Sequence, residues 1–121
     1  MNKSKIPQII LIDEKGEHLG VQGSYCWNGI CIDYVKPSSR DKDIHEQLSL
    51  PKGTTITFRV LDHISPDNLH VTFFSGDQIV LHEEVKVKMK IKLSRGIYFL
   101  NVKATWEGEG DVSNVFLVKI L

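Results

Sequence analysis

Residues 23–33 read Gly23-Ser24-Tyr25-Cys26-Trp27-Asn28-Gly29-Ile30-Cys31-Ile32-Asp33 and contain both cysteines of the chain. Asn-Gly between two apolar-rich runs indicates a β-hairpin, because both residues tolerate the positive φ angles of a two-residue type I′ turn. With Asn28 and Gly29 in the turn, Cys26 faces Cys31 in a non-hydrogen-bonded pair. The facing Cα atoms of such a pair lie about 4.5 Å apart, which a disulfide can span. The register therefore permits a Cys26–Cys31 disulfide, and we expect it to form.

Side-chain alternation divides this hairpin into two faces. The face expected to pack inward carries Tyr25, Trp27, Ile30 and Ile32. The face expected to meet solvent or a polar neighbour carries Ser24, Cys26, Cys31 and Asp33. We also expect Trp27 and Trp106 to be largely buried.

The length and composition fit one soluble globular domain covering residues 1–121. The 15 Lys and Arg residues balance the 15 Asp and Glu residues, so no net charge favours nucleic acid or an anionic membrane. No apolar run approaches the ~20 residues of a membrane span. The basic start is followed by an apolar run, 6–12, that is too short for an export signal, and this favours the cytoplasm or a processed chain.

Short apolar runs separated by turn signals predict an all-β chain. Beyond the hairpin, we expect strands over 6–12, 17–22, 54–61, 69–75, 78–82, 85–93, 97–106 and 112–121. Turns about every ten residues favour an immunoglobulin-like antiparallel β-sandwich of about seven to nine strands. A closed barrel is the alternative.

Two segments depart from simple strands. Residues 36–50 form a polar excursion, and we expect at most one or two helical turns over 44–50. Such long loops are often functional, although a solvated crossover is the commoner explanation. In 85–93, alternate positions carry four lysines, which indicates a solvated face or an edge strand protected by lysine rather than a basic binding surface.

No catalytic motif is present, and we expect neither an enzyme nor a cofactor. The five histidines are scattered, although His70 and His82 lie on strands that could pair and hold a surface metal. Ordinary surface histidines are the favoured interpretation. The acidic tip at 107–111 lacks the fixed spacing of a calcium loop and is predicted to be a solvated turn.

The segment Gly23-Ser24-Tyr25-Cys26-Trp27, followed by Cys31-Ile32-Asp33, resembles a group of small, uncharacterised proteins of spore-forming Gram-positive bacteria. Many of these look like secreted or lipid-anchored envelope proteins. The later counterparts here are Pro51-Lys52-Gly53, Gly96-Ile97-Tyr98, Trp106 and Gly110-Asp111. The resemblance implies an all-β domain with a paired-cysteine hairpin and an envelope or secreted location, but no established activity. We expect this chain to depart from the group in lacking a lipid-attachment cysteine and a signal sequence.

Our first functional hypothesis is a non-catalytic binding domain whose partner is an unknown protein or envelope component. The candidate binding residues are Tyr25, Trp27, Asn28, Gly29 and Asp33, beside the Cys26–Cys31 pair. The alternative is a redox-responsive protein in which this pair opens and closes. A sandwich of this kind could also present a loop as a proteinase inhibitor does, which is an analogy of fold alone.

Overall fold

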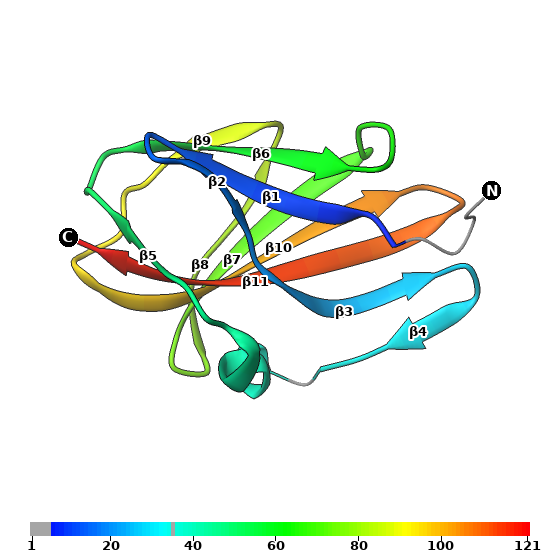
Figure 1. Cartoon of the computed structure of the whole chain (residues 1–121), viewed down its shortest axis with the longest axis horizontal. Helices are drawn as coiled ribbons and strands as arrows, with labels where there is room; N and C mark the ends of the chain where they lie inside the picture. The colour runs from blue at the N-terminus through cyan, green and yellow to red at the C-terminus, as the bar shows by residue number, and fades with distance from the viewer. Residues whose placement is uncertain (1–5, 35) are drawn as a thin grey trace.

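The structure, a computed structural model, describes residues 6–34 and 36–121, which form two facing β-sheets (Figure 1). The four-stranded sheet has the order β2 (Gly16–Leu19), β1 (Gln8–Asp13), β6 (Thr55–Leu61) and β9 (Lys88–Lys90). The seven-stranded sheet follows the order β4 (Ile30–Ile32), β3 (Val21–Trp27), β11 (Gly110–Ile120), β10 (Gly96–Trp106), β7 (Asn68–Ser75) and β8 (Gln78–Val85). The remaining strand, β5 (Gln47–Leu50), pairs with β11. The predicted all-β sandwich is confirmed.

The core lies between the two sheets and is built from the alternate residues that point inward from each strand. Leu100, Val102 and Ala104 of β10, for example, are fully buried. Burial of a whole aliphatic or aromatic side chain stabilises a fold by roughly 1.5–3 kcal/mol. The sandwich is therefore held mainly by apolar contacts between the sheets.

One buried polar residue links the sheets directly. Asn114 of β11 is fully buried, and its Oδ1 accepts a hydrogen bond from the backbone N–H of Ile9 at 2.9 Å. Its Nδ2 donates to Gln8 Oε1 at 2.9 Å. Both polar atoms of this amide are therefore satisfied, as a buried amide requires, and they connect β11 to β1.

The expectation of helix over 44–50 was wrong. The helical segment is instead the 3₁₀ helix η1 (Pro37–Asp43), with Pro at its start where no N–H is needed. Residues 47–50 form β5, which runs parallel to β11 and buries Leu48 and Leu50. Burial of these two leucines outweighs the local helical tendency.

The prediction of one continuous strand over 85–93 was also wrong. Val85 ends β8 in the seven-stranded sheet, whereas Lys88–Lys90 belongs to the four-stranded sheet, so the regular alternation crosses between sheets. Val87 lies in this crossing and is 54% exposed. The edge interpretation is confirmed, because β9 ends its sheet with Lys88 and Lys90 exposed.

The run at 17–22 is two strands rather than one. Residues before Gly20 belong to β2 in the four-stranded sheet, and residues after it begin β3 in the seven-stranded sheet. This division moves a strand boundary without adding a strand, because Val21 and Gln22 join the first strand of the hairpin. Strand β5 is the addition that brings the described residues to eleven strands, above the predicted seven to nine.

His18 connects the β1–β2 turn to the segment before β5. Its Nε2 lies 2.9 Å from Asp13 Oδ1 and its Nδ1 lies 3.1 Å from Glu46 Oε2. Burial favours a lower pKa for His18, but the hydrogen bonds and charges of Asp13 and Glu46 outweigh burial and raise this pKa above 6.5. Burial likewise favours a higher pKa for Asp13, but hydrogen bonds from His18 and from the Lys15 N–H lower it below 3.8.

The contacts of protonated His18 contribute fully to the free energy of unfolding below pH 6.5, the unfolded pKa of histidine. We expect this contribution to be lost as the pH rises from 6.5 through the higher folded pKa of His18. The Asp13 contribution is complete above pH 3.8 and is lost as the pH falls through its lowered folded pKa. Urea unfolding across this range should therefore show a decline on the alkaline side, limited to about 1.4 kcal/mol per pH unit. His18→Gln should flatten that decline. An unchanged decline in the variant contradicts the assignment.

Candidate functional site: the disulfide hairpin

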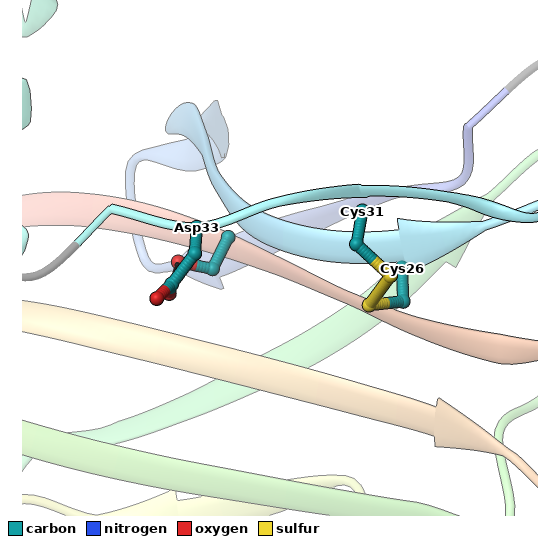
Figure 2. The surroundings of a disulfide bond; sticks show 4 residues. Cys26, Cys31 and Asp33 are labelled. Atoms are coloured by element: carbon teal, nitrogen blue, oxygen red, sulfur yellow. Dashed lines mark hydrogen bonds between the residues drawn. A yellow bond between two sulfur atoms is a disulfide. The ribbon is translucent and has the colours of Figure 1, made fainter.

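The β3–β4 hairpin has the geometry that its sequence predicts. Asn28 and Gly29 have φ angles of 54° and 78°, and the register pairs Cys26 with Cys31. The two cysteines form a disulfide with their Cα atoms 4.0 Å apart. Figure 2 shows this bond joining the two strands, with Asp33 projecting from the same side. The predicted disulfide and register are confirmed.

Ser24 fixes the chain where it leaves the hairpin. Its Oγ accepts a hydrogen bond from the Tyr34 N–H at 2.8 Å and lies 3.2 Å from Asp33 Oδ1, to which it can donate. Ser113 Oγ donates to the backbone carbonyl of Ser24 at 2.6 Å. The Ser24 hydroxyl therefore holds residues 33–34 against β3, and the Ser113 hydroxyl joins the β3 backbone to β11.

An aromatic cluster anchors the opposite face of the hairpin. The ring of Trp27 makes edge contacts with those of His63 and Trp106, at centroid separations of 5.2 and 5.4 Å. His63 Nε2 lies 2.6 Å from Glu109 Oε2, and Trp106 Nε1 donates to the backbone carbonyl of Ile64 at 2.9 Å. The cluster joins the hairpin to the β6–β7 loop and the β10–β11 turn. The predicted burial of both tryptophans is confirmed.

The expectation that Ile30 and Ile32 pack inward was wrong. They are 59% and 40% exposed. Strand β4 lies at the edge of its sheet and pairs with β3 alone among the described strands. The predicted alternation of side chains is correct, and both isoleucines lie on the inner face of β4. They are exposed because the opposite sheet does not extend over this edge strand.

The candidate binding residues divide into two groups. Asn28, Gly29 and Asp33 are exposed. Tyr25 is half-buried and Trp27 is buried in the core, so we assign these two the role of holding the hairpin in place. Ile30 and Ile32 were not among the predicted binding residues, because their apolar character by itself predicted core positions.

No family model and no curated protein matches the chain. Function is therefore argued from the geometry of the hairpin and its surroundings.

The histidines proposed for a surface metal site do lie together. The rings of His70 and His82 stack at 5.7 Å, and His82 Nδ1 is 2.7 Å from the Thr72 hydroxyl. Glu84 Oε1 is 4.0 Å from His70 Nε2. Within residues 6–34 and 36–121, no group of three or more His, Cys, Asp and Glu side chains is placed to hold a metal ion.

The acidic tip at 107–111 contacts the β6–β7 loop: Glu109 lies against His63, and the Glu107 N–H donates to Asp67. In the part of the chain that the structure describes, no helix has the length and apolar character needed to cross a membrane.

Removal of the disulfide should weaken the fold by a modest amount. A loop of this length gives about 2 kcal/mol of stabilisation through the unfolded state. We expect Cys26→Ser/Cys31→Ser to lower the free energy of urea unfolding by that amount. Reductant should shift the wild type toward the double variant and leave the variant unchanged. Equal stability of the wild type with and without reductant contradicts this prediction.

Proposed function

We propose that this protein is a non-catalytic binding domain that engages a protein partner through the edge of the β3–β4 hairpin. The observation that carries the proposal is the exposure of Ile30 and Ile32 on a strand with one unpaired edge among the described residues. An extended peptide can add to such an edge through backbone hydrogen bonds, while the exposed apolar side chains provide contact area.

The rigidity of the hairpin supports this role. The disulfide fixes β4 to β3, and Trp27 fixes β3 to the core through His63 and Trp106. A surface that is already ordered loses little conformational entropy on binding. The tip residues Asn28 and Gly29 then flank the apolar edge and can add polar contacts.

The resemblance described above supports a cell-envelope partner and an envelope location, and we propose both on that basis. We also propose an immunoglobulin-like relationship for the sandwich. The two largely antiparallel sheets, the turn at Lys52-Gly53 and the start of β10 at Gly96-Ile97-Tyr98 support that relationship.

A redox-responsive role is the second candidate, favoured by the position of the disulfide. Cys31 is exposed and lies on the edge strand, so a reductant can reach it, and reduction would remove the covalent link between β4 and β3. A measured reduction potential near that of the glutathione pool supports this role. A value below about −300 mV marks a structural bond and contradicts it.

The binding proposal is tested by comparing the two edge strands of the same sheet. Ile79 and Val80 on β8 are 60% and 44% exposed, closely matching the hairpin pair. We expect wild type and Ile79→Asp/Val80→Asp to capture the same protein from envelope extracts, and Ile30→Asp/Ile32→Asp to lose it. Undiminished capture by the β4 variant contradicts the proposal.

A further inference from the structure

A cavity of about 250 Å³ lies on the outer face of the seven-stranded sheet, beside the base of the β3–β4 hairpin, where Ser24 and Tyr34 line it. Asn101 and Lys103 of β10 line its floor, and they alternate with the buried core residues of that strand. Tyr34 and η1 lie over it. Figure 1 shows η1 on the side of this sheet opposite the four-stranded sheet.

The segment over the cavity is held at several points. Arg40 Nε donates to the backbone carbonyl of Gln22 at 2.9 Å, and its guanidinium carbon lies 4.5 Å from the ring centroid of Tyr34. Ser38 Oγ donates to Asp77 Oδ1 in the β7–β8 turn at 2.5 Å. The cavity is therefore preformed, as small-molecule sites usually are.

Three polar side chains that line the cavity have no partner among the described residues. Neither the Asn101 amide, the Lys103 ammonium nor the Asp111 carboxylate makes a hydrogen bond or ion pair with any residue in 6–34 or 36–121. Lys103 and Asp111 carry opposite charges in one cavity and yet are not paired with each other. These groups are therefore available to a ligand that carries both charges.

The order of these groups along the sheet defines the ligand further. Lys103 of β10 pairs with Ser113 of β11, and Asp111 lies two residues before Ser113. Asn101 is the outward-facing residue of β10 next to Lys103, on the side away from Asp111. Phe74 lines the cavity beyond Asn101, because it pairs with the following outward position of β10. The cavity thus runs from a carboxylate, past a cation and an amide, to an apolar surface.

We infer that this cavity binds a free α-amino acid with an apolar side chain. Asp111 receives the ammonium group, Lys103 and Asn101 bind the carboxylate, and the side chain lies against Phe74. The volume equals that of about eight water molecules, which is enough for such a ligand. This inference is independent of the proposed function, because the cavity does not include the β4 edge.

Nuclear magnetic resonance titration of the labelled full chain with L-leucine tests the inference. We expect saturable chemical-shift changes at Asn101. Two analogues of leucine, a carboxylate that lacks the ammonium group and an amine that lacks the carboxylate, should each bind at least about tenfold more weakly. Lys103→Met and Asp111→Asn should each weaken leucine binding by a similar factor. Lys119→Met, a matched exposed lysine of β11 outside the cavity, should bind as the wild type does.

Several outcomes would overturn the inference. Absence of saturable shifts with leucine excludes the site. Equal affinity for the carboxylate lacking the ammonium group shows that Asp111 does not select a zwitterion. Equal weakening by Lys119→Met shows that the effect is one of net charge.

Discussion

Trp27→Ala should lower the free energy of unfolding by ~3–5 kcal/mol, the range typical of truncating a buried aromatic residue. Trp27 is only 7% exposed and makes edge contacts with both His63 and Trp106. Truncation leaves a cavity beside His63 and Trp106 and removes both ring contacts. Trp27 joins the hairpin to both the β6–β7 loop and β10 through these two rings.

Equilibrium urea unfolding of Trp27→Ala measures this effect. Ile30→Ala is the matched control, because Ile30 is the cross-strand neighbour of Trp27 but is largely exposed. We expect the control to change stability by no more than about 0.5 kcal/mol. If Trp27→Ala and Ile30→Ala lower the free energy of unfolding equally, the aromatic cluster does not anchor the hairpin.

Gly110→Ala should be the most damaging glycine substitution near the hairpin, lowering the free energy of unfolding by at least about 3 kcal/mol. Gly110 begins β11 with a φ of 151°, opposite Trp27 in the β3 register. A Cβ at this position would lie 2.2 Å from the Cys26 carbonyl oxygen. Because the obstacle is backbone, β3 and β11 would have to separate.

Gly108→Ala in the same turn separates backbone strain from this steric contact. Gly108 also has a positive φ, of 81°, but a Cβ there would meet no atom within 4 Å. Its substitution should cost about 1 kcal/mol, the strain of the left-handed conformation alone. Thermal or urea unfolding of both variants makes the comparison, and equal losses would show that the close approach at Gly110 is unimportant.

The sequence predicted local features of the hairpin better than its place in the sandwich. The Asn28-Gly29 turn and the Cys26–Cys31 pairing depend on adjacent residues, so the turn and register could be predicted. The exposure of Ile30 and Ile32 depends on where the opposite sheet ends, and alternation contains no such information. The division of the pattern at 85–93 between two sheets was hidden for the same reason.

Pairing between distant residues also limited what the sequence could predict about β5 and about the cavity on the outer face of the seven-stranded sheet. The parallel pairing of β5 with β11 joins residues far apart in the chain, and it replaced the expected helical turns at 44–50. The cavity combines Arg40 with Asn101 and Lys103, which no local motif connects. The one useful signal was the long polar excursion at 36–50, which contains η1.

The Cys26–Cys31 bond tests the account most directly, because the rigid hairpin edge depends on it. The measurement is the intact mass of protein purified without reductant, before and after treatment with a thiol-alkylating reagent. We predict two unreactive cysteines and a mass two hydrogens below that of the reduced chain. Two freely alkylated thiols would contradict the bonded hairpin and remove the main support for its edge as a preorganised binding surface.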